Sequence, residues 1–170
     1  YSKSDIVIYC TESMKILSSL FELYDEQKYI YVLVKESPTN LEGSDLVKDG
    51  WHIMVPELVI PFKYLREARN KRMINKEILN IFGNMNLNMN IKDIIDGTIY
   101  KKGSWFTYGS TKPDSKPYQL KYVFKYTDDT LVEIDISNDT ESNDKNIITD
   151  PRFLIDLFSL RNKKEKFVLK

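Results

Sequence analysis

The stretch at residues 29–35, YIYVLVK, constrains the fold most, because it is rich in β-forming residues and apolar on both faces. A strand of this kind has to lie inside a sheet whose two faces are both covered. Residues 51–55, WHIMV, predict a second strand beside it. Residues 118–125, YQLKYVFK, alternate between apolar and polar positions, and the TDDT turn leads into LVEIDI, which predicts a hairpin.

Helices are predicted at both ends of the chain. Apolar residues recur at helical spacing from Ile6 to Tyr24, with Ser2 or Ser4 as the cap and Asp5 in the first turn. Near the carboxyl end, Pro151 is expected to start a short helix that runs to residue 158, after a polar loop at 137–149.

A further helical stretch is expected between the second strand and the hairpin. Pro61 suits a first helical turn, Gly83 is expected to stop the helix, and a break near Asn70 divides it in two. Residues 36–50 are expected to form a polar loop. The order of elements predicts an α+β fold in one domain, with a mixed or antiparallel sheet and flanking helices.

Composition excludes several classes of protein. The 170 residues are 42% hydrophobic, as in globular proteins, and no apolar run is long enough to cross a bilayer. Cys10 is the only cysteine, which excludes a disulfide framework and a cysteine-based zinc site and favours a reducing compartment. The formal net charge of zero argues against binding nucleic acid by bulk charge, although a local basic face remains open.

His52 is the only histidine of the chain. If residues 51–55 form a strand, Trp51, Ile53 and Val55 share one face, and His52 shares the other with Met54. One interpretation is a strand histidine with a satisfied hydrogen bond, and the other is an imidazole that donates to a ligand oxygen such as a phosphate.

Asp96 stands in IIDGTIY, where Asp-Gly is typical of a type I′ hairpin turn between two short strands. The alternative is a carboxylate at a strand end that binds a hard cation such as Mg²⁺.

Residues 108–113, YGSTKP, could offer backbone N–H groups, the Ser110 hydroxyl and the Lys112 ammonium to a phosphate, although a surface turn explains them equally well. The Walker A pattern is absent.

Basic residues are crowded between positions 63 and 76. This stretch predicts either a surface that follows a phosphate backbone or a solvated helix face. Its basic side chains are Lys63, Arg66, Arg69, Lys71, Arg72 and Lys76. Glu133 and Asp135 also share a strand face, as a metal-binding pair would, but their surroundings indicate an ordinary hairpin.

The order of these motifs resembles a known family. DGWHIMVP, followed later by IIDGTIYKKGSWFTYGSTKPDSKPYQLKYVF, is similar to the primase domain of the primase–helicases of large nucleocytoplasmic DNA viruses. YIYVLVKESP and FLIDLFSLR extend the resemblance over nearly the whole chain. These domains belong to the archaeo-eukaryotic primase superfamily, and each motif by itself is short and unspecific.

The resemblance implies a DNA primase or primase-polymerase that transfers nucleotides from NTP or dNTP on a single-stranded DNA template, with Mg²⁺ or Mn²⁺ as cofactor. His52 would contact the phosphates of the incoming nucleotide, Asp96 would supply the third metal-binding carboxylate, and Ser110 and Lys112 would lie beside the triphosphate. The basic residues Lys63, Arg66, Arg69 and Arg72 would contact nucleic acid.

Two further metal ligands of the family come from a DxD strand upstream of the first helix, and a helicase follows the primase domain. The chain begins with Tyr1, so we expect residues 1–170 to be part of a primase domain in a longer chain that also carries the helicase, and to be inactive alone. The resemblance also implies an intracellular place of action, in the host cytoplasm or at a viral replication site, with no membrane partner. The alternative is a non-catalytic primase-like module that binds single-stranded nucleic acid or docks a helicase.

Overall fold

The computed structural model describes residues 1–85, 87, 89–98, 108–111, 116–136, 151–159 and 163–170. Its centre is an antiparallel sheet in the order β5-β2-β6-β7, formed by β5 (Trp51–Met54), β2 (Tyr29–Lys35), β6 (Tyr118–Thr127) and β7 (Thr130–Ile134). The central place of residues 29–35, the neighbouring strand at 51–54 and the hairpin were all predicted correctly. The α+β class with an antiparallel sheet and flanking helices is confirmed.

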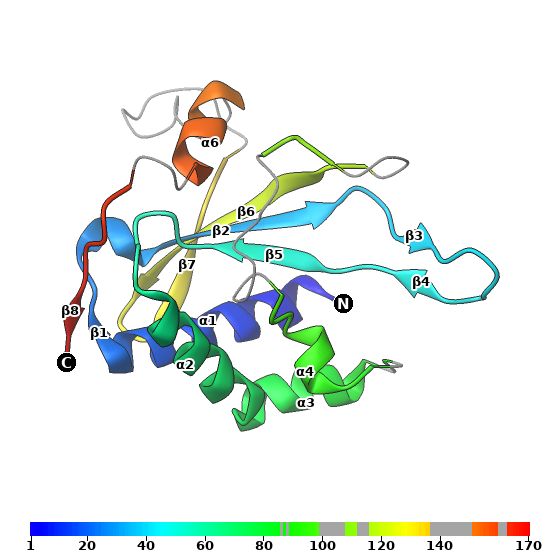
Figure 1. Cartoon of the computed structure of the whole chain (residues 1–170), viewed down its shortest axis with the longest axis horizontal. Coiled ribbons are helices and arrows are strands. Elements are labelled where there is room, and N and C mark those ends of the chain that lie inside the picture. Colours follow the sequence, from blue (N-terminus) through cyan, green and yellow to red (C-terminus); the bar gives the residue numbers. More distant parts are fainter. Residues whose placement is uncertain (86, 88, 99–107, 112–115, 137–150, 160–162) are drawn as a thin grey trace.

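In the part that the structure describes, most of the helices lie on one side of the sheet, and α6 (Pro151–Phe158) lies on the other (Figure 1). We call the first side the helical face. It is covered by α1 (Lys3–Leu20) and α2 (Phe62–Met73), with α3 (Lys76–Asn84) and α4 (Ile91–Ile94) beside them. The opposite face is covered by α6 (Pro151–Phe158), whose Phe158 ring meets Tyr31 edge-on at a centroid distance of 5.5 Å.

The main core lies between the sheet and the helical face. Burying apolar side chains on both surfaces provides the largest favourable contribution to folding. Its most deeply buried members are Ile6, Cys10, Met14, Leu17, Phe21, Ile30, Val32, Ala68 and Phe124.

Helix α1 begins as the sequence predicts. The Ser2 hydroxyl accepts from the N–H of Asp5 over 3.2 Å, and the Asp5 carboxylate accepts from the N–H of Ser2 over 2.6 Å. This capping box satisfies two N–H groups that the helix cannot pair internally.

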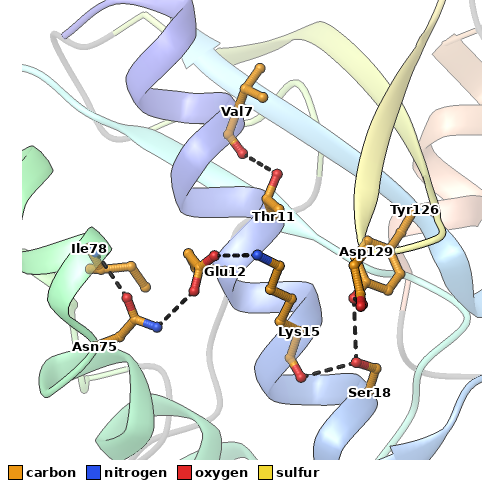
Figure 2. Close-up of polar contacts among 9 residues, drawn as sticks. All are labelled: Val7, Thr11, Glu12, Lys15, Ser18, Asn75, Ile78, Tyr126 and Asp129. Atoms are coloured by element: carbon orange, nitrogen blue, oxygen red, sulfur yellow. Dashed lines mark hydrogen bonds and ion pairs between the residues drawn. The ribbon is translucent and has the colours of Figure 1, made fainter.

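The break between α2 and α3 lies later than predicted, because Asn75 rather than Asn70 divides the helices. The Asn75 side chain accepts from the N–H of Ile78 over 3.0 Å, as an N-cap does, and donates to Glu12 of α1 over 2.9 Å (Figure 2). Gly83 does not stop α3, which continues to Asn84.

The predicted polar loop at 36–50 is partly strand. Its residues form a narrow ribbon of β3 (Thr39–Asn40) and β4 (Val47–Lys48), which extends the β2 and β5 pair beyond the sheet (Figure 1). The loop predicted at 137–149 lies outside the described residues.

A second two-stranded sheet joins the segment after α1 to the carboxyl end of the chain. Strand β1 (Phe21–Glu22) follows α1 directly and pairs with β8 (Val168–Leu169). In the part that the structure describes, no helix combines the length and apolar character needed for a membrane span.

Candidate functional site

His52 lies on β5, on the face of the sheet away from α1 and α2. Trp51, Ile53 and Val55 pack against the main core, so the period-two prediction for this strand is correct. Across the strand pair, His52 stands opposite Leu33 of β2. The half-buried imidazole therefore lies on an outer strand of the described four-stranded sheet.

The His52 ring stacks on Tyr118 of β6. The ring centroids are 3.9 Å apart and the planes differ by 14°. Tyr118 stands opposite Lys35 of β2, whose ammonium lies 5.8 Å from the tyrosine ring centroid and donates to Thr39 over 3.0 Å. Three strands thus contribute to the surroundings of the imidazole.

A β-bulge brings Tyr118 to this side of the sheet. Val32 of β2 pairs with Tyr122, but the next residue, Leu33, pairs with Leu120, so Lys121 is an extra residue in β6. One inserted residue reverses which side chains face which side. Tyr122 therefore faces the main core, whereas Tyr118 faces the side of His52. The regular alternation seen in residues 118–125 does not indicate this reversal.

The environment of His52 keeps its imidazole neutral. The pKa of His52 is lowered from 6.5 to about 4, chiefly by burial and in smaller part by the positive charge of Lys35, while the Asp96 carboxylate acts in the opposite direction. A neutral imidazole has one N–H donor and one acceptor nitrogen. The effect of Asp96 also means that the carboxylate lies within electrostatic range of the ring.

Asp96 follows α4 and does not stand at a strand end. The prediction of a strand before Asp96 is wrong, because residues 91–94 form α4, and Gly97 lacks the positive φ that a type I′ turn requires. Asp96 Oδ1 instead accepts from the N–H of Thr98 over 2.7 Å. This bond, with smaller contributions from Arg69 and Lys48, lowers the pKa of the exposed Asp96 carboxyl, which is ionised at neutral pH.

Arg69 holds the segment that carries Asp96. Its Nε donates to the carbonyl of Ile95 over 2.8 Å, and its Nη2 donates to the carbonyl of Lys92 over 2.6 Å. A Cβ atom on Gly97 would lie only 3.1–3.3 Å from the guanidinium, so glycine allows this close approach. Arg69, which was predicted to contact DNA, is thus engaged in hydrogen bonds within the chain.

The other three predicted DNA contacts on α2 divide into two groups. Arg72 is also engaged internally, because its Nε donates to the hydroxyl of Ser13 in α1 over 3.1 Å. Lys63 and Arg66 are exposed, one helical turn apart. Sequence alone did not separate these groups, because the distinction depends on which helix packs beside α2.

Ser110 is exposed and follows a turn in which Gly109 has a φ of 81°. The hydroxyl of the preceding Tyr108 accepts from the N–H of Leu120 over 3.3 Å. Leu120 pairs with Leu33, which in turn stands opposite His52, so Tyr108 anchors the turn to the strand row that contains His52. Lys112 lies outside the described residues.

The Glu133–Asp135 pair and His52 lie at opposite edges of the described four-stranded sheet. Glu133 is on β7, the opposite outer strand from β5, and pairs with Lys3 at 2.5 Å. Asp135 directly follows β7. Among the residues that the structure describes, no group of three or more His, Cys, Asp or Glu side chains is placed to hold a metal ion.

The chain also matches a known protein family. The family model described as the C962R protein N-terminal AEP domain matches residues 1–124. That range contains His52, Asp96, Ser110 and Tyr118. No curated protein and no solved structure shows significant similarity to the chain. Since the match covers most of the chain, the protein belongs to the family of C962R N-terminal archaeo-eukaryotic primase (AEP) domains.

Proposed function

We propose that the chain is the nucleotide-binding part of a primase domain that transfers nucleotides from NTP or dNTP to a primer or initiating nucleotide on a DNA template. The main support is the match to the family of AEP domains over residues 1–124, a range that contains both His52 and Asp96. The electrostatic interaction between these two residues adds to this support. The His52 imidazole is a donor suited to phosphate, and the Asp96 carboxylate is a ligand suited to a hard cation. Lys35 and Lys48 add positive charge around these two groups.

His52 has the role of phosphate contact in this proposal. The neutral imidazole donates its N–H to a phosphate oxygen, and the negative charge of a bound triphosphate then raises the pKa of the ring. Ser110 and Lys112 contribute a hydroxyl and an ammonium to the same triphosphate. These roles remain consistent with the order in which the motifs occur in the family.

Asp96 has the role of metal ligand. Mg²⁺ is commonly held by one or two protein carboxylates together with substrate phosphates. The ionised, exposed Asp96 is suited to be one of these carboxylates. Bound Mg²⁺ or Mn²⁺ would neutralise the triphosphate and activate the attacking hydroxyl. The bond from Thr98 and the contacts of Arg69 hold the carboxylate-bearing segment in place.

The proposal is tested by primer extension and de novo synthesis with the full-length protein in Mg²⁺ or Mn²⁺. We expect Asp96→Asn to lower kcat by about a hundredfold or more, since a metal-binding carboxylate is lost while the acceptor for Thr98 is kept. His52→Ala is expected mainly to raise KM for the nucleotide. Asp93→Asn, an exposed change in α4 just before Asp96, is the matched control and should leave both constants unchanged. Unchanged kinetics in a folded Asp96→Asn variant would contradict the proposal.

A second candidate is a non-catalytic module that binds single-stranded nucleic acid, next to a helicase in the same longer chain. The exposed Lys63 and Arg66 on α2 support it, because paired basic side chains at helical spacing can contact neighbouring phosphates. The two candidates predict different results. Strand binding that persists in a protein with no nucleotide transfer in either metal would favour the module.

A further inference from the structure

The His52 and Tyr118 rings come from strands that are not neighbours. β5 and β6 lie on either side of β2, so their backbones are separated by about twice the strand spacing of about 4.8 Å. The rings are nevertheless 3.9 Å apart, which requires both side chains to lean over β2. Leu33, the β2 residue opposite His52, is only 6% exposed.

The contact depends on an irregularity of the sheet. Without the extra Lys121, residue 118 would face α1 and α2, and no aromatic ring from this position could reach His52. β-Bulges redirect side chains and occur frequently beside functional sites. The bulge therefore places the Tyr118 ring beside His52, whereas a regular strand would direct this ring to the other face of the sheet.

The stack covers a face of the imidazole and not its edge. A parallel ring covers a face of the imidazole, whereas both ring nitrogens lie in the plane of the ring. Stacking therefore fixes the orientation of the ring without using its donor or acceptor. Lys35 of β2 lies directly opposite Tyr118 of β6, so its ammonium lies near the stacked rings.

We propose that Tyr118 is a positioning residue for His52: its ring holds the imidazole in the orientation in which the imidazole N–H meets a phosphate. This inference rests on the phosphate role proposed for His52. Tyr118 itself need not touch the nucleotide, and its hydroxyl is not required for the stack.

The first test is binding of inorganic tripolyphosphate to the chain by calorimetry, which isolates the phosphate contact from base and sugar. We expect Tyr118→Leu to weaken binding about three- to tenfold, the value of a favourable aromatic pair. Tyr118→Phe keeps the ring and should bind as the wild type does. Tyr118→Val, a strand former without a ring, provides a second ring-less variant if the leucine variant fails to fold.

A double-mutant cycle separates positioning from general packing. In a His52→Ala background, Tyr118→Leu should cause no further loss of affinity. An equal loss with and without the imidazole would overturn the positioning role. If the wild type binds no tripolyphosphate, the phosphate role of His52 fails and the positioning inference fails with it, whereas binding without coupling rejects only the role of Tyr118.

Nuclear magnetic resonance gives an independent readout, because the single histidine produces one set of imidazole signals. A stacked tyrosine shields the imidazole C–H protons. We expect the shielding to be lost in Tyr118→Leu and retained in Tyr118→Phe. Imidazole shifts that are the same in all three proteins would overturn the inference.

Discussion

Arg69 of α2 joins its helix to the segment that carries Asp96, because its guanidinium donates to the carbonyl of Ile95 over 2.8 Å. A second bond reaches the carbonyl of Lys92 in α4. Helix α2 in turn packs on the main core through Ala68. The position of Asp96 therefore depends on a side chain whose charge, in the sequence, suggested contact with DNA.

The first prediction concerns this connection. Arg69→Ala should lower the free energy of unfolding by about 1.5–3 kcal/mol, because hydrogen bonds from a charged donor are lost and two carbonyl groups lose their partner. Hydrogen exchange at residues 92–98 should also become faster. Urea unfolding provides the measurement. Arg66→Ala, an exposed change on the same helix, should stay within about 0.5 kcal/mol of the wild type.

A second prediction concerns pH. The pKa of His52 is about 4 in the folded chain, below the ordinary value of 6.5. As pH falls from about 6.5 towards 4, the unfolded chain takes up a proton before the folded chain does, so stability is lost over this window. Because the ring is partly solvated, the loss should be about 1–2 kcal/mol. Urea unfolding at pH 7 and pH 5 measures it.

His52→Gln is the control for this pH dependence, because glutamine does not titrate. The carboxylates with lowered pKa, such as Asp5 and Glu12, lose their stabilising effect in more acid solution, and they do so in both proteins. The difference between wild type and variant therefore isolates His52. A stability difference that is the same at pH 7 and pH 5 would contradict the lowered pKa.

A third prediction concerns the junction of α1 and α3. Asn75→Ala should cost about 1–2 kcal/mol, because the N-cap of α3 is lost together with the bond to Glu12 (Figure 2). Asn80→Ala removes the same chemical group from an exposed position inside α3 and should be close to neutral. Thermal unfolding of both variants would show whether the cap contributes as expected.

The β6–β7 turn allows a fourth prediction. Asp128 and Asp129 have φ values of 49° and 59°, which glycine adopts more readily than aspartate. Asp128→Gly should therefore stabilise the chain by about 0.5 kcal/mol. Asp129→Gly should instead destabilise it by about 0.5–1 kcal/mol, since the carboxylate accepts from the hydroxyl of Tyr126, a core residue, over 2.5 Å. Equal effects of the two changes would contradict this difference.

The sequence predicted most of the sheet and the face on which His52 lies, because both depend on local periodicity. It failed at Asp96, where four residues of helix are too short to show a helical period and Asp-Gly imitates a hairpin turn. The stack of His52 on Tyr118 was also missed. A bulge inserts one residue without changing the apolar pattern, so the face of Tyr118 depends on strand pairing that the sequence does not display.

The last prediction concerns single-stranded DNA. If α2 contacts the phosphate backbone, Lys63 and Arg66 should do so, whereas Arg69 and Arg72 are engaged with Ile95 and Ser13. Lys63→Glu with Arg66→Glu should weaken binding of a labelled strand at low salt and reduce the salt slope of log affinity by about 1.4, since two contacts release fewer counterions. Fluorescence anisotropy across a salt series measures both quantities.

The matched control is Lys164→Glu with Lys170→Glu, which removes the same net charge from exposed positions near the carboxyl end. We expect it to leave the salt slope unchanged, because overall charge affects the approach of the strand while direct phosphate contacts set the slope. Equal weakening by the two pairs would mean that DNA responds only to overall charge. Lys63 and Arg66 would then form a solvated helix face, and the support that they give to a strand-binding module would be withdrawn.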